Sequence, residues 1–138
     1  GGNISVDKDG ILNLEVDAII ANGSASSQGG NIRCYQGTVN MNGGVVYGGV
    51  AAGSHNHNIW VTGTATTRGQ MTLRGGFILG NAAATRAGSC IYVSGGSGLV
   101  LAGNALVVDN CEYAGIRIAD GQLTTDDSWT GIANIQNS

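Results

Sequence analysis

Histidine offers the most direct chemistry in this chain, and its two copies, His55 and His57, are separated by one residue. Two imidazoles at this spacing could share a metal ion, but a stable site needs a larger set of ligands. The nearby sequence holds no Asp, Glu or Cys to complete it. We therefore interpret the segment as a solvated turn and predict no metal site.

The carboxylates gather towards the two ends of the chain. They are Asp7, Asp9, Glu15 and Asp17, and then Asp109, Glu112, Asp120, Asp126 and Asp127. Glycoside hydrolysis needs two carboxyl groups that face one cleft, which this distribution does not favour. Asp7-Lys8-Asp9-Gly10 resembles the opening of a calcium loop but lacks the later ligands. We predict no catalytic residue and no cofactor.

Composition indicates one glycine-rich domain. The 138 residues include 25 glycines and no proline, and 42% of them are hydrophobic, which is enough for a single core over residues 1–138. Both ends look cut, as in a fragment or module of a longer protein. The net charge of −3 and scattered arginines argue against nucleic acid as a partner. No apolar run is long enough to predict membrane insertion.

A triplet with apolar residues on both sides of a variable one recurs at roughly 24 to 32 residues, the range of solenoid repeats. Its copies are Ile4–Val6, Ile32–Cys34, Ile59–Val61, Ile91–Val93 and Ile116–Ile118. A second set follows in step: Leu12–Leu14, Val39–Met41, Met71–Leu73, Leu99–Leu101 and, more weakly, Leu123–Thr125. A third apolar segment usually closes on asparagine, as at Asn22, Asn81, Asn110 and Asn134.

These triplets predict short strands that stack on one another. Alternation buries the flanking residues and turns the middle one outward, and one coil cannot bury its apolar side chains alone. Asparagine at a corner tolerates left-handed backbone, and its amide can bond the amide of the next coil. The predicted fold class is all-β, a right-handed parallel β-helix (solenoid) of about five coils with three short strands per coil.

The spacing of residues 75–110 resembles the right-handed β-helix repeats of large bacterial surface and secreted proteins, the pectate-lyase-like superfold. The resemblance covers nearly the whole chain and implies an extracellular or cell-surface location. Its motifs are structural, and lyases, polygalacturonases, phage tailspikes and adhesins share them, so they select no activity. A pectate-type lyase would use an arginine base and acid-bound calcium, whereas here most arginines and acids fall in different coils.

The outward residues of the first strand form a column with two interpretations. The column is Ser5, Arg33, Trp60, Tyr92 and Arg117. The resemblance implies a glycan-binding face, on which Trp60 and Tyr92 would stack on sugars while the arginines hold acidic groups. The alternative is an aromatic ladder that stabilises the solenoid. The third coil, which contains Trp60, is the best place for a pocket. It also contains His55, His57 and an inserted turn over residues 62–70.

The third segment is apolar without alternation, so an apolar column must remain outside. Counting back from the corner at the end of each third segment places Ile19, Val46, Ile78 and Val107 in one column. The next column along the strands contains the candidate interface residues Ile20, Tyr47, Leu79 and Val108. Either the long corners after Asn22, Gly49 and Asn81 cover this stripe, or another copy or a neighbouring domain does.

The three cysteines fall into two classes. Cys34 is an inward residue of its strand and should be a small buried group. Cys90 and Cys111 lie around the same corner of neighbouring coils, where a disulfide is an open alternative if their Cα atoms come close enough.

These observations favour a non-catalytic extracellular module, a spacer or adhesin-like scaffold that binds glycan or protein. The partners we expect are neighbouring domains or another copy of the chain, with a polysaccharide as a further candidate. One alternative is a fragment of a polysaccharide lyase or glycoside hydrolase, and another is a self-assembling fibre subunit.

Overall fold

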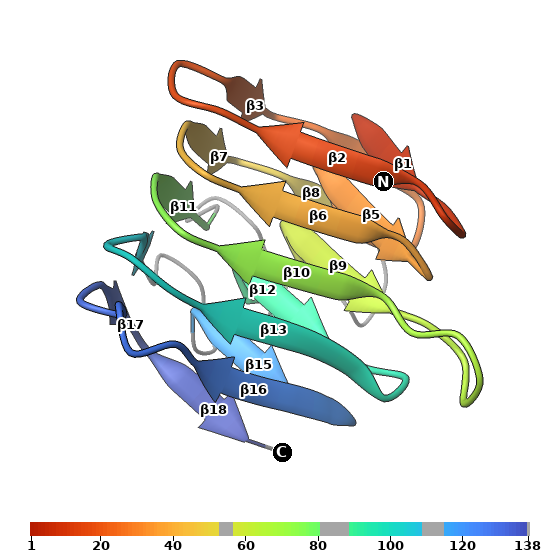
Figure 1. The fold of residues 1–138 in the computed structure, drawn as a ribbon. Coiled ribbons are helices and arrows are strands. Elements are labelled where there is room, and N and C mark those ends of the chain that lie inside the picture. The colour runs from red at the N-terminus through yellow and green to blue at the C-terminus, as the bar shows by residue number, and fades with distance from the viewer. Residues whose placement is uncertain (53–56, 81–88, 109–114, 138) are drawn as a thin grey trace.

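The computed structural model describes residues 1–52, 57–80, 89–108 and 115–137, and shows stacked parallel sheets wound as a solenoid (Figure 1). Sheet A contains β1 (Ile4–Val6), β5 (Ile32–Tyr35), β9 (Ile59–Thr62), β12 (Ile91–Val93), β15 (Ile116–Ile118) and β18 (Ile135–Asn137). Sheet B contains β2 (Ile11–Leu14), β6 (Thr38–Met41), β10 (Gln70–Leu73), β13 (Ser97–Leu101) and β16 (Gly121–Thr125). Sheet C contains β3 (Ile19–Ala21), β7 (Val45–Tyr47), β11 (Phe77–Leu79), β14 (Leu106–Val108) and β17 (Ile132–Ala133).

The chain visits sheets A, B and C in this order and winds in the right-handed sense, with sheet B in front of sheet A in Figure 1. Each strand pairs in parallel with its counterpart in the neighbouring coil. A small sheet D, formed by β4 (Ser24–Ala25) and β8 (Val50–Ala51), lies at the corner between sheets C and A. The predicted fold class is confirmed. No helix in the described residues is long and apolar enough to cross a bilayer.

The register of the strands agrees with the repeat that the sequence predicts. Ile4, Ile32, Ile59, Ile91, Ile116 and Ile135 stand in one column of sheet A. The five triplets predicted for the first strand align as expected, and β18 adds a sixth strand. The predicted second strands align equally well in sheet B.

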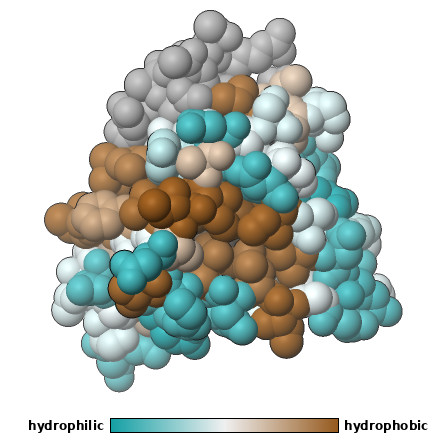
Figure 2. Space-filling view, turned by 90° about the horizontal axis from the view of Figure 1, so that it is seen from above, coloured by the Kyte–Doolittle hydropathy of each residue, from teal (hydrophilic) through white to brown (hydrophobic). Residues whose placement is uncertain are grey.

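The core lies along the solenoid axis, where the inward residues of the three sheets meet. Completely buried side chains include Ile32, Met41, Ile59, Met71, Leu73 and Leu101. Figure 2 looks onto the N-terminal coil and shows apolar side chains gathered in its middle, with hydrophilic ones along much of the rim. One coil buries little by itself, so the stack makes the core.

The alignment predicted for the third segment was wrong by one residue in the first coil. Ile20 pairs with Val46, and Ile19 pairs with Val45. Asn22 therefore occupies the corner position of Gly48, and both have positive φ, 55° and 69°. The sequence-based alignment had instead matched Asn22 with Gly49, and this displaced the first coil by one residue. As a result Ile20 points into the core at 9% exposure and is not an interface residue.

Asparagine side chains form hydrogen bonds between coils, but not at the end of the third segment, where they were predicted. The side chain of Asn3 donates to Asn31 Oδ1 (2.6 Å), and that of Asn31 donates to Asn58 Oδ1 (2.7 Å). Each of these residues directly precedes a strand of sheet A. Asn31 Oδ1 also accepts from the Gly23 N–H (2.8 Å). Asn22 stands in a left-handed turn, Asn134 directly precedes β18, and Asn81 and Asn110 lie outside the described residues.

Candidate binding face

The outward side chains of sheet C form a continuous apolar surface, which we call the sheet C face. It comprises Ile19, Ala21, Val45, Tyr47, Phe77, Leu79, Leu106, Val108 and Ile132. Exposed fractions are 70% for Ile19, 38% for Tyr47, 46% for Phe77, 41% for Val108 and 72% for Ile132. The expected apolar stripe is present on the outside, and its use as an interface stays a prediction.

The described corners do not hide this surface. The chain after Asn22 and after Gly49 forms the strands of sheet D at the corner between sheets C and A, while Ile19 and Tyr47 stay exposed. The corner after Asn81 lies outside the described residues. The described corners therefore leave the sheet C face uncovered at Ile19 and Tyr47.

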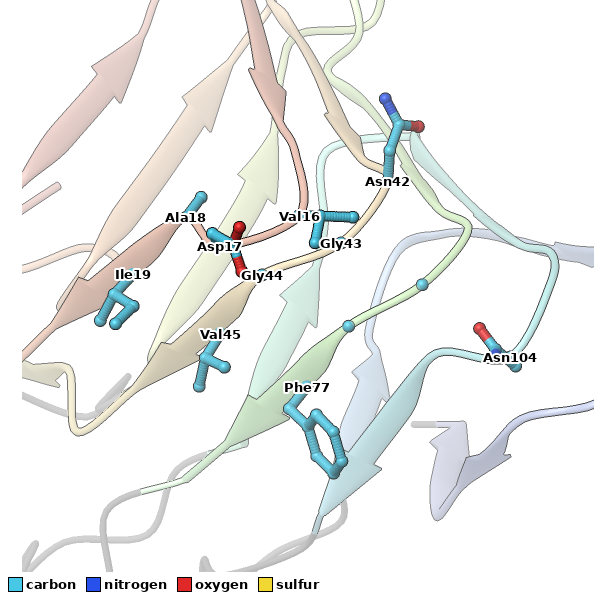
Figure 3. A pocket seen from close by; sticks show the side chains of 12 residues that line it. Val16, Asp17, Ala18, Ile19, Asn42, Gly43, Gly44, Val45, Phe77 and Asn104 are labelled. Carbon is cyan, nitrogen blue, oxygen red and sulfur yellow. The ribbon is translucent and has the colours of Figure 1, made fainter.

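A groove of about 620 Å³ follows the corner between sheets B and C, beside the sheet C face. Four successive coils line it, with Val16, Asp17, Ala18, Ile19, Asn42, Gly43, Gly44, Val45, Gly75, Gly76, Phe77 and Asn104. Ile19, Val45 and Phe77 follow one another on β3, β7 and β11 (Figure 3). A smaller hollow of about 270 Å³ lies farther along the same face, against Leu106, Val108 and Ile132.

The glycines along the groove allow the coils to stack closely. Gly44 and Gly76 both have φ of 88°, a backbone region that favours glycine. A Cβ on Gly76 would lie 2.4 Å from the carbonyl oxygen of Gly44 in the coil above. Gly-Gly pairs recur in the sequence at residues 43–44 and 75–76, and the structure places both pairs at this corner.

Charge at this corner is predominantly negative. Asp17 lines the groove, and Glu15 accepts a hydrogen bond from the Asn42 side chain (2.9 Å). Asn42 Oδ1 also accepts from Arg74 (3.4 Å). At the C-terminal end of the corner, hydrogen bonds from the backbone N–H and hydroxyl of Ser128 lower the pKa of Asp126.

The outward column of sheet A is arranged differently. Register places Arg33, Trp60, Tyr92 and Arg117 in one column, as predicted. Trp60 and Tyr92 are each only 8% exposed, and their rings meet edge to face with centroids 5.2 Å apart. The Trp60 Nε1–H donates to Ser94 Oγ (2.8 Å). These contacts are those of an aromatic ladder and leave little ring surface for a sugar.

His57 is part of this cluster, so its interpretation as a solvated side chain was wrong. It is fully buried, and its ring stacks on Tyr92 at 4.3 Å. Its Nδ1 accepts a hydrogen bond from the Ser89 N–H (2.9 Å), which requires that this nitrogen carry no proton. The pocket expected in this coil is occupied by rings. His55 lies outside the described residues.

The two arginines of the column contact aromatic rings and one acid. The Arg33 guanidinium lies 4.5 Å from the centroid of Tyr35 and forms an ion pair with Asp7 (3.0 Å). Arg117 lies 5.6 Å from the ring centroid of Tyr92. Asp7, which opens the calcium-like sequence, is therefore paired with an arginine. The described residues contain no group of three or more His, Cys, Asp or Glu side chains placed to hold a metal ion.

Cys34 and Cys90 are both buried. Burial raises the pKa of the Cys34 thiol to about 11, and the thiol donates to the Gly37 carbonyl (3.3 Å). The Cys90 thiol donates to the carbonyl of Val108 (3.1 Å). Cys111 lies outside the described residues, so the disulfide stays a prediction.

Comparison of the chain with protein-family models, curated proteins and solved structures finds no match. The fold and the geometry of its faces are therefore the grounds for a functional argument.

Proposed function

We propose that this chain is a non-catalytic, extracellular β-solenoid module that serves as a rigid scaffold and binds a protein partner through the sheet C face. The observation that carries the proposal is that five of the eight exposed large apolar side chains in the described residues lie on the sheet C face: Ile19, Tyr47, Phe77, Val108 and Ile132. Contiguous apolar surface of this kind marks interaction sites in soluble proteins. The location rests on the resemblance to bacterial surface and secreted β-helices.

Sheet C supports this proposal better than sheet A supports glycan binding. A ring that stacks on a sugar must present an open face, but His57 and Arg117 lie against the Tyr92 ring and Trp60 is almost completely buried. Catalysis has little support in the described residues, because the groove is lined by a single carboxylate, Asp17. Cleavage by a hydrolase needs a second one across the cleft.

Association at high concentration tests the proposal. We expect the wild-type chain to bind a dye specific for apolar surfaces and to associate weakly in sedimentation velocity experiments. Tyr47→Asp or Leu79→Asp should reduce both signals more than Trp60→Ala does, provided that circular dichroism shows folded protein. A monomeric chain whose dye binding is unchanged in both aspartate variants would refute the role of this face.

Two further measurements address the alternatives. Release of unsaturated or reducing ends from pectin or alginate would indicate an enzyme instead of a scaffold. An apparent molar mass from light scattering that grows steadily with concentration in both aspartate variants would indicate a fibre that assembles through other surfaces.

A further inference from the structure

The shape of the sheet C face limits what can occupy it. Its strands contain two or three residues each, so the outward columns lie only about 7 Å apart, and five strands at about 4.8 Å spacing extend about 19 Å. The rectangle between the two outward columns measures about 130 Å² by this geometry, and the adjoining groove widens it on one side. A stable interface between two globular proteins buries about 800 Å² on each partner.

A second copy would therefore bind weakly through this surface alone. The length of the face instead suits a slender partner. An extended segment rises about 3.3 Å per residue, so about six residues would span the stack of five strands. The groove itself crosses four coils, from Val16 to Asn104, and so runs along the solenoid axis.

Backbone pairing at the groove indicates how such a segment would be held. The N–H groups of Val45, Phe77 and Leu106 donate to carbonyls of the preceding coil, Ala18, Gly44 and Gly76, at 2.8 to 2.9 Å. These groups are committed to the stack of coils, so recognition would rely on side chains. Val16, Ile19, Val45 and Phe77 provide apolar contacts.

Charge at the corner selects the flanking residues of the partner. Asp17 lines the groove, and Glu15 lies two residues before it at the same corner. Asp126 and Asp127 follow β16 at this corner in the last coil, beyond the groove, and Arg74 is a cation at the corner. Potentials of opposite sign steer and orient a partner, and this corner attracts cations.

Building on the proposed function, we propose that the occupant of the groove and sheet C face is a short extended peptide segment that alternates apolar residues with Lys or Arg. Its apolar side chains lie against Val45 and Phe77, and its basic side chains lie along the edge that carries Asp17. No covalent step is involved.

Fluorescence anisotropy with three labelled hexapeptides tests this inference. The probe is Lys-Val-Lys-Phe-Lys-Val; one control replaces each Lys by Glu, and the other replaces each apolar residue by Ser. We expect only the probe to bind, and added salt to weaken it, since exposed charges are screened.

Protein variants locate the site. Phe77→Ala should weaken binding about tenfold, which corresponds to the loss of one good apolar contact. Asp17→Asn should weaken it a few-fold and reduce the dependence on salt; Asp17 has φ of 73°, which Asn tolerates. The matched controls are Ile11→Ala, an exposed apolar residue of sheet B, and Asp120→Asn, an acid at another corner. Both should bind as the wild type does.

The outcomes separate this inference from the proposed function. Equal binding of all three peptides, or unchanged binding to Phe77→Ala, would overturn the peptide site. Displacement of the probe by cellohexaose would overturn it in favour of a neutral glycan. A tight dimer of the wild-type chain that Tyr47→Asp dissociates would also overturn it while the proposed function stands. If the probe peptide does not bind and dye binding is unchanged in the aspartate variants, both the peptide site and the proposed function are contradicted.

Discussion

The outward sides of sheets A and C are built by the same strand alternation, yet they are used in opposite ways. On sheet A the outward Trp60 and Tyr92 are nearly as buried as the core, because each ring packs against another and against His57. On sheet C the outward Phe77 and Tyr47 are exposed by more than a third. An outward direction from the strand is thus a poor guide to exposure. Neighbouring coils decide whether an outward side chain contributes to stability or remains available for binding.

Replacing one aromatic residue on each side tests this contrast most strongly. Trp60→Ala should lower the free energy of unfolding by about 3 to 5 kcal/mol, as for other buried aromatic side chains. It removes the contact with Tyr92 and the hydrogen bond to Ser94. Phe77→Ala should cost no more than about 1 kcal/mol, because half-exposed apolar area contributes less. Urea denaturation followed by circular dichroism measures both, and equal losses would contradict the contrast.

The corner that joins the two sides depends on its asparagines. Asn31→Ala should cost about 2 to 3 kcal/mol, because it leaves the buried Gly23 N–H without its acceptor and removes the buried bond to Asn58 Oδ1. Asn40 bonds Asn13 on the surface of sheet B, so Asn40→Ala provides a matched control with an expected loss below about 1 kcal/mol. Similar midpoints for the two variants in urea would show that the buried ladder adds no special stability.

Close stacking beside the sheet C face can be tested at Gly76. Gly76→Ala should destabilise the fold by about 1 to 3 kcal/mol, because the residue has positive φ and the added methyl group approaches the Gly44 carbonyl. Since the groove follows the same corner, peptide binding should weaken in this variant even at temperatures where it remains folded. Unchanged thermal unfolding would indicate that the coils can separate locally without loss.

The smallest expected effect concerns the interior beneath sheet A. The pKa of Cys34 is raised to about 11 from an ordinary value near 9, so the folded state holds this proton more tightly than the unfolded chain does. Stability should therefore fall as the pH rises from about 9 and level off above about 11, with a loss of about 1.4 kcal/mol at pH 10. Cys34→Ala should lack this component. A pH profile identical in the two proteins would exclude Cys34 as its source.

Much of the fold was predictable because the period is carried by particular residues. Isoleucine at the start of each sheet A triplet, and Leu, Val or Met in sheet B, recur at positions that the register aligns directly. The third segment was harder to align, since Val45, Val46 and Tyr47 are all apolar and give no alternation. Asn22 stands at the position of Gly48, one place before Gly49, and this single step was enough to shift the alignment.

The candidate site was predictable only in part. Tyr47, Leu79 and Val108 were identified as outward and apolar, whereas Val16, Asp17 and the groove beside Phe77 were not. Their signal is spread over four coils and exists only when the coils are stacked. The same holds for Asn3, Asn31 and Asn58, whose bonds join residues about one coil apart.

The sequence by itself determined the repeat, the three strands per coil and the inward columns of sheets A and B, because alternation and burial are local properties of a strand. Only the tertiary structure decided which outward residues are covered. Trp60 and Tyr92 lie in neighbouring coils, pack against each other and both contact His57, whereas Phe77 stays half-exposed. That difference arises between coils, where no single repeat carries the information.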